Sequence, residues 1–209
     1  MYEGTAATKL TRTSMSEAVP SWSPDGTRIA FSTFAESDGG RIWVMTADGG
    51  DAHEIYAEEH AFVGFQDWSP DGRSLLPGID RGGGGQLDLY AIGVEGDGLT
   101  QLTTARGDDS GGRWRPDGEQ IVFWSDGNPQ GPGIYLMHGD GSQQTRILAD
   151  DLGADTITFA WSPDAAQIAW VAKFEGGDGS PIFLMRSDGT DLRQLSDDLQ
   201  ERTSLDWTP

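Results

Sequence analysis

The sequence contains no cysteine, only three histidines, and only two lysines, Lys9 and Lys173. Without cysteine the chain can form no disulfide framework, thiolate zinc site or cysteine nucleophile. The first ten residues lack the basic and apolar regions of a secretory signal peptide. No apolar run approaches the roughly 20 residues that cross a bilayer. We therefore expect no membrane insertion, and the composition leaves the compartment open.

Basic charge is also scarce. The chain carries 34 Asp and Glu against 14 Lys and Arg, which gives a formal net charge of −20. Such a surface repels phosphate backbones and anionic membranes, so we expect no nucleic-acid partner. The acidic residues either form a solvated surface or serve a basic partner or a cation.

One short string recurs along the chain. "WSPDG" begins at Trp22 and Trp68, "WRPDG" at Trp114, "WSPDA" at Trp161, and "WTP" at Trp207, at intervals of 46 or 47 residues. A second series of acid-glycine pairs keeps the same period, and each is followed by an aliphatic residue at Leu10, Ile55, Leu102, Ile147 or Leu195. Repeats of about 40–50 residues are typical of β-propeller blades.

Each repeat contains short runs of β-branched and aromatic residues bounded by Gly, Pro, Asp and Ser, as strands usually are. Four such strands form a small sheet that must stack on its neighbours to bury its faces. We predict an all-β fold and one β-propeller domain over residues 1–209. Its four complete blades span about 17–57, 62–104, 110–149 and 156–196, with an incomplete blade made of 1–11 and 203–209.

The repeated string, the following "IAF"-type strand and the later Asp-Gly turn resemble the WD40-like repeats of TolB-type β-propellers. Related repeats form the propellers of prolyl-oligopeptidase-like serine peptidases and of oligogalacturonate lyases. The resemblance implies closure with six or seven blades, so this chain is expected to be an arc or segment. It also implies an extracytoplasmic, periplasmic location. Self-association through open propeller edges is a further expectation.

Three repeats depart from the pattern, and blade 3 does so by having Arg115 in place of the serine. Pro77 and Gly78 stand where the other blades have aromatic or β-branched residues, so we expect that strand to be shortened or bulged. Ala165 replaces the glycine of the string, so its turn must either avoid a positive φ or accept strain.

Every residue type of the string has a structural task. Trp packs between blades, Pro presets φ, Asp bonds its own turn, and Gly takes a positive φ. In a four-stranded meander these turns share one end of the sheet with the Asp-Gly turns. The variable loops share the other end, where binding usually occurs. The candidate partner-binding residues there are Asp38, Asp80, Arg81, Asp126, Asn128 and Asp178.

Acidic pairs in the connections between blades fall at the same end: Glu58-Glu59, Asp108-Asp109, Asp150-Asp151 and Asp197-Asp198. Asp108-Asp109 lies closer to its Trp than the others and breaks their phase. These acids are spread around a ring and form no D-x-D-x-D-G loop, so the pattern favours a solvated surface over a Ca²⁺ site.

The sequence gives little support to catalysis. It has no G-x-S-x-G nucleophile elbow. His53, His60 and His138 fall at different repeat positions, so no triad or His-centred metal site is expected. We expect no cofactor and no enzyme activity, and the favoured function is a non-catalytic scaffold that binds a protein or peptide. Two alternatives stay open: a propeller portion of a larger prolyl-oligopeptidase-like peptidase, and a small-molecule or Ca²⁺ binding module on the acidic loops.

Overall fold

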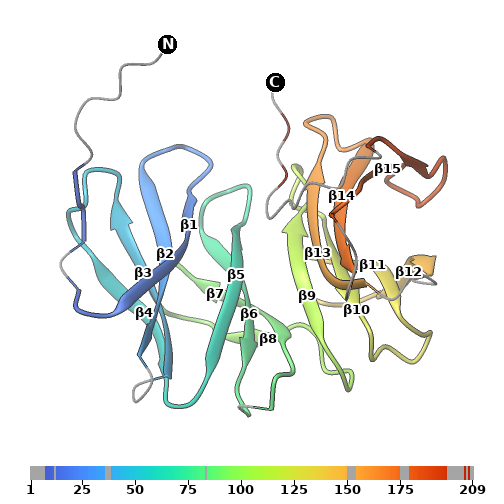
Figure 1. Ribbon diagram of the computed structural model, residues 1–209. Helices are drawn as coiled ribbons and strands as arrows, with labels where there is room; N and C mark the ends of the chain where they lie inside the picture. The colour runs from blue at the N-terminus through green and yellow to red at the C-terminus, as the bar shows by residue number, and fades with distance from the viewer. Residues whose placement is uncertain are drawn as a thin grey trace.

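The structure is a computed structural model of the chain that describes residues 8–11, 13–35, 39–82, 84–149, 154–174, 179–196, 205 and 207. All its regular elements in these residues are strands, grouped in four four-stranded antiparallel sheets (Figure 1). Within this part of the chain no helix is long and apolar enough to cross a membrane. The prediction of a β-propeller with four complete blades is confirmed.

Consecutive strands form each blade in chain order. Blade 1 contains β1 (Ser16–Trp22), β2 (Arg28–Ala35), β3 (Gly39–Thr46) and β4 (His53–Glu58). Blade 2 contains β5 (Phe62–Trp68), β6 (Ser74–Asp80), β7 (Asp88–Gly93) and β8 (Thr100–Gln101). Blade 3 contains β9 (Asp109–Trp114), β10 (Gln120–Ser125), β11 (Gly133–His138) and β12 (Thr145–Ala149). Blade 4 contains β13 (Ala154–Trp161), β14 (Gln167–Phe174), β15 (Ile182–Arg186) and β16 (Arg193–Gln194).

The first strand of each blade contacts the first strand of the next, so β1, β5, β9 and β13 form the inner side of an arc (Figure 1). The hydrophobic core is divided among the junctions between blades. Between blades 2 and 3, for example, Leu76, Leu89 and Leu102 belong to the same buried cluster as Phe123 and Tyr135. Neighbouring sheets thus bury the faces that one sheet would leave exposed.

The repeated Trp adds a directed bond to this apolar packing. The indole Nε1 of Trp68 donates to the carbonyl of Ser21 at 3.1 Å, and that of Trp161 donates to Arg113 at 3.3 Å. Trp207 makes the same bond to Ala160 at 3.1 Å. Trp22 has no preceding blade in the described residues, and 60% of its surface is exposed. Trp68 and Trp161 therefore fasten their inner strands to the inner strand before. Trp114 of blade 3 differs, because its buried Nε1 has no hydrogen-bond partner. Its backbone amide donates instead to Asp67 Oδ2 of β5 at 2.9 Å.

The Asp-Gly turn makes a second repeated contact. Gly96, Gly141 and Gly189 have φ near +85° and lie directly over Ile55, Leu102 and Ile147 of the preceding blade. A Cβ on Gly189 would come within 2.1 Å of the Ile147 carbonyl. Gly49 lies over Leu10 in the same manner. Residues 8–11 thus pack on blade 1 in the place that the outer strand of a preceding blade would take, although they carry no strand assignment.

The departures at Pro77 and at Ala165 have different outcomes. β6 runs through Pro77 and Gly78 and is not shortened. A register shift does lie beside Pro77, between Val63 and Gln66 on β5, but the first two strands of each other blade contain a similar shift. Proline is therefore not its cause. Ala165 adopts a φ of +59°, so blade 4 accepts the strained conformation.

Replacing Trp68 with Ala should cost about 3–5 kcal/mol of unfolding free energy, because a buried indole and its inter-blade bond are both lost. Trp22→Ala is the matched control at the same repeat position. Its effect should stay near 1 kcal/mol or less, because that ring is mostly exposed. Urea unfolding measures both, and equal losses would contradict the inter-blade role.

Replacing Ala165 with Gly should stabilise the chain by about 1 kcal/mol, since glycine adopts a positive φ without steric cost. The reverse change, Gly26→Ala, should destabilise by a similar amount. Gly26 has φ +69°, and an added Cβ there meets no atom within 4 Å, so only the backbone is tested. Thermal unfolding of both variants would show shifts of opposite sign; shifts of the same sign would exclude backbone strain as the cause.

Candidate functional site

The meander divides the loops of each blade between two ends of the molecule. The turns between first and second strands and between third and fourth strands lie at one end, which we call the regular-turn face. The loops between second and third strands and the connections between blades lie at the opposite end, which we call the variable-loop face. The two faces are built from different kinds of sequence and have different hydrogen bonding.

On the regular-turn face, the carboxylates of the repeated string are engaged within their own turns. Asp25 Oδ1 accepts bonds from the Ser23 hydroxyl at 2.6 Å and the Thr27 amide at 3.0 Å. Asp71 and Asp164 accept the same pair of bonds in blades 2 and 4. The hydrogen bond from Ser23 is the main cause that lowers the pKa of Asp25 to about 2. In each of these carboxylates Oδ1 is thus committed to the turn.

Blade 3 keeps the turn by other means. Arg115 replaces the serine, and its Nε lies 3.3 Å from Asp117 Oδ2 in an ion pair. Asp117 Oδ1 still accepts the Glu119 amide at 3.0 Å. The Arg115 guanidinium also lies over the Trp161 ring, 5.9 Å from its centroid. In blade 3 an ion pair with Arg115 therefore holds the turn aspartate, where a serine hydroxyl holds it in the other blades.

On the variable-loop face, the structure brings some of the predicted binding residues together. Asp80 ends β6 and Arg81 follows it, and Asp126 and Asn128 follow β10 of the next blade. Asp38 and Asp178 lie outside the described residues. Asp80 is buried, and its carboxylate accepts the amides of Gly82 and Gly85 at 2.9 and 2.6 Å. Asp80 thus shapes its own loop.

The other three candidates also have partners. Arg81 Nε lies 2.8 Å from Glu58 Oε2, and this ion pair links blade 2 to blade 1. Asp126 Oδ1 accepts the Asp108 amide at 2.6 Å. Asn128 Nδ2 donates to Gln144 Oε1 at 3.1 Å. Asp126 remains exposed, whereas Asn128 is half-buried.

A group of carboxylates gathers at the junction of blades 2 and 3. We call Asp88, Asp108, Asp109 and Asp126 the junction carboxylates. Asp108 Oδ1 accepts the Leu87 amide at 2.7 Å, and the Asp109 amide donates to the Leu87 carbonyl at 2.7 Å. The start of β9 is thereby tied to the start of β7. Sequence reasoning noted Asp108 and Asp109 as a pair out of phase but missed Asp88, which stands inside a strand.

Asp109 is the unusual member of the group. Only 1% of its surface is exposed, and neither carboxylate oxygen has a hydrogen-bond partner of ordinary geometry. Burial raises the pKa of Asp109 to about 6, and the charges of Asp88 and Asp108 add to the increase. The nearby hydroxyls of Ser125 and Thr103 offset part of it. Burial also raises the pKa of Asp88 and Asp108.

Asp109→Asn should stabilise the chain by about 2–3 kcal/mol at pH 7.5 and have little effect near pH 4. The folded pKa lies above the ordinary value of 3.8, so the wild type is favoured while the carboxyl is protonated and loses stability as the pH rises through about 6. Urea unfolding of both proteins at several pH values gives the difference. A difference that does not change with pH would contradict an unpaired buried charge.

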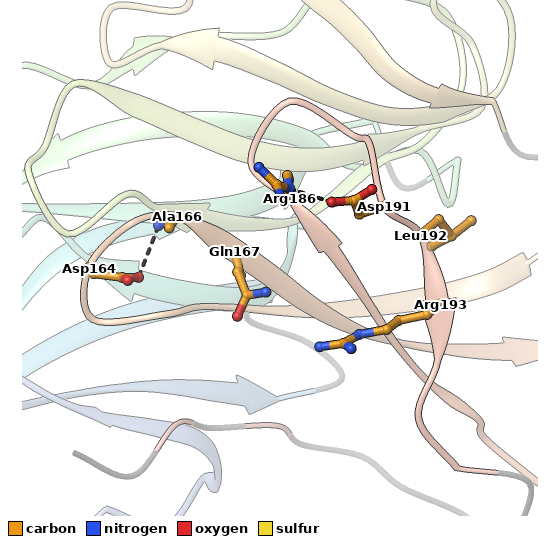
Figure 2. A pocket seen from close by; sticks show the side chains of 7 residues that line it. All are labelled: Asp164, Ala166, Gln167, Arg186, Asp191, Leu192 and Arg193. Carbon is orange, nitrogen blue, oxygen red and sulfur yellow. Dashed lines mark hydrogen bonds and ion pairs between the residues drawn. The ribbon is translucent and has the colours of Figure 1, made fainter.

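The regular-turn side of blade 4 carries a hollow of about 610 Å³ (Figure 2). Asp164 lines it from the first turn and Gln167 from the start of β14. Arg186, Asp191, Leu192 and Arg193 line it from β15, β16 and the turn between them. Arg186 is paired with Asp191, and Asp164 accepts the Ala166 amide. A similar hollow on blade 2 is lined by Ser69, Asp71 and Ser74 and by Trp114 of blade 3. The blade 4 hollow thus belongs to a surface against which blades pack.

The histidines lie on separate elements. His53 is in β4, His60 follows β4, and His138 ends β11. The two ring nitrogens of His53 face the carbonyls of Asp51 and Val94, each at 3.0 Å, and these bonds raise the pKa of the imidazole. Among the described residues no three His, Cys, Asp or Glu are grouped so that they could hold a metal ion.

Comparison with known proteins identifies the repeat. The family described as the TolB beta propeller domain matches residues 1–204. The chain belongs to this TolB β-propeller family. Among curated relatives, a TolB homolog from Chlorobium luteolum is 28% identical over 148 residues, which cover 69% of this chain and 31% of that protein. An uncharacterized peptidase, YuxL of Bacillus subtilis, is 25% identical over 138 residues, 50% of this chain and 21% of its own.

Solved structures share the fold at low identity. TolB from Acinetobacter baumannii superposes with a TM-score of 0.71 and 21% identity, over 90% of this chain and 45% of that one. Puromycin hydrolase superposes with a TM-score of 0.66 and 16% identity, over 89% of this chain and 29% of that one. This TolB propeller chain therefore spans less than half the length of these relatives.

Proposed function

We propose that this chain is a non-catalytic propeller scaffold that binds a protein or peptide partner through its variable-loop face. The observation that carries the proposal is the difference between the two faces. Turn carboxylates of the regular-turn face are engaged by their own backbone, as Asp25 and Asp71 are. The loops of the other face differ in sequence from blade to blade, and exposed loops on a rigid scaffold commonly carry binding.

Membership of the TolB propeller family supports a scaffold, because the repeat itself brings no catalytic group. The described part of the chain supports the same proposal, since its histidines lie apart and its aspartates mostly serve turns. The surface charge points to a partner that tolerates or complements an acidic surface.

The test is capture of a partner from extracts of the native organism with the tagged chain. A loop-face variant carries Arg81→Ala, Asn128→Ala and Gln130→Ala. The matched control carries Arg73→Ala, Glu119→Ala and His138→Ala, three exposed side chains on the regular-turn face. We expect the first variant to lose at least tenfold of the captured partner and the control to retain it. Capture of nothing by the wild type, or loss in the control alone, would overturn the proposal.

A second candidate is a propeller portion of a larger prolyl-oligopeptidase-like peptidase. The relative named as a peptidase favours it, because the chain matches only 21% of that protein's length. The two candidates differ in what the gene encodes beyond Pro209. A G-x-S-x-G motif in an α/β region would support the peptidase. Further WSPDG repeats followed by a stop codon would support the scaffold.

A further inference from the structure

The junction carboxylates lack positive partners. In the residues that the structure describes, the ion pairs are Arg41–Glu54, Arg81–Glu58, Arg115–Asp117 and Arg186–Asp191, and none includes a junction carboxylate. The charges that act on Asp88, Asp108 and Asp109 come from other aspartates, with Asp80 and Asp126 among them. Several negative charges are therefore held together at one junction without an internal cation.

Three of the junction carboxylates are held in place by hydrogen bonds that they accept. Asp88 accepts Gln101 Nε2 at 3.0 Å, and Asp108 and Asp126 accept backbone amides. Asp109 differs, because both of its oxygens are buried and no donor meets them in ordinary hydrogen-bond geometry, although the Ser125 and Thr103 hydroxyls lie nearby. Ionising a buried carboxyl that lacks a positive partner costs free energy. A positive charge placed beside it would remove that cost.

The positions of these groups make the junction reachable from outside. Asp126 is exposed, Asp88 and Asp108 are half-buried, and the neighbouring residues Gly84, Gly85 and Gln86 are exposed. Arg81 is occupied by Glu58. Arg106 is exposed and in no ion pair with the junction carboxylates.

The spread of the carboxylates selects the kind of cation. A divalent metal needs several oxygens converging on one point at 2–2.6 Å. No group of three or more acidic or histidine side chains has such an arrangement in the part of the chain that is described. A Lys ammonium or Arg guanidinium on a peptide can instead bridge oxygens several ångströms apart.

We propose that the junction carboxylates form a subsite for the Lys or Arg side chains of a basic peptide, which docks across blades 2 and 3 on the variable-loop face. This inference rests on the proposed function and specifies the partner's chemistry. The bound cation stabilises the ionised form of Asp109 and of its neighbours. Binding therefore releases protons and tightens as the pH rises from about 5 to 7.

The groups that face Asp109 decide this pH dependence. Asp88 on β7 and Asp108 beside it on β9 act on it directly, and the hydroxyls of Thr103 and Ser125 lie next to it. The negative charge of Asp109 also raises the pKa of Tyr135 on β11. Asp80 and Asp126 act on Asp108. The Arg146 guanidinium on β12 acts on Tyr135 as well. The groups that act on Asp109 itself are acids and hydroxyls, so protonation of the carboxylates weakens the site as the pH falls.

A fluorescein-labelled pentalysine peptide serves as the probe, and fluorescence anisotropy measures its binding at low salt. The junction variant carries Asp88→Asn, Asp108→Asn and Asp126→Asn. The control carries Asp48→Asn, Asp140→Asn and Asp188→Asn, three exposed turn carboxylates on the regular-turn face. Both variants change the net charge by the same amount. Asparagine retains the single oxygen acceptor that five of the six positions use, whereas Asp88 accepts Gln101 at Oδ2 and Thr103 at Oδ1.

We expect the junction variant to bind pentalysine about tenfold more weakly than the wild type and the control to stay within twofold. Wild-type binding should tighten between pH 5 and 7, and this change should shrink in Asp109→Asn. Equal weakening in both triple variants, or binding independent of pH, would overturn the subsite. Spermidine that binds as tightly as pentalysine would overturn the peptide assignment.

Thermal unfolding checks that each variant is folded. If the triple variant does not fold, the single variant Asp126→Asn, at an exposed position, is used in the same binding measurement. The outcome is separable from that of the proposed function. A partner captured equally well by the wild type and the junction variant contradicts this subsite alone. Capture of no partner contradicts the scaffold function itself.

Discussion

The structure depends on the contact between neighbouring blades. A four-stranded sheet of this size cannot bury both faces, so each blade is stable only against the next. The chain repeats two devices at that contact. The Trp of the string reaches back to an inner-strand carbonyl, as Trp68 and Trp161 do, and the glycine of the Asp-Gly turn lies on an aliphatic residue of the preceding outer strand. The 46-residue period of the sequence follows from this requirement.

Because these contacts occupy the repeated residues, function has to be sought elsewhere. The turn aspartates each use Oδ1 to accept hydrogen bonds that shape the regular-turn face. The loops of the variable-loop face make no such repeated contact, and their sequences differ from blade to blade. In the described residues this face contains a group of crowded carboxylates at the start of β9, one of which, Asp109, is buried. A rigid scaffold thus supports a face that can vary in chemistry.

The fold could be read from the sequence because its signals are periodic: the Trp spacing, the Asp-Gly turns and the aliphatic positions agree in every repeat. The candidate site was only partly predictable. Asp80 and Asp126 were identified from their loops, but Asp80 proves to be a buried loop-shaping residue. Asp88 was missed because it lies within an apolar run. The burial of Asp109 depends on packing between two blades, which no local pattern encodes.

The most direct test of the account is hydrogen–deuterium exchange of the chain with and without its captured partner. We predict that protection on binding is confined to the variable-loop face, in residues 80–88, 106–109 and 126–132. The turns at residues 23–27, 69–73 and 162–166 should exchange at unchanged rates. Protection centred on those turns, with the variable loops unaffected, would contradict the assignment of binding to the variable-loop face.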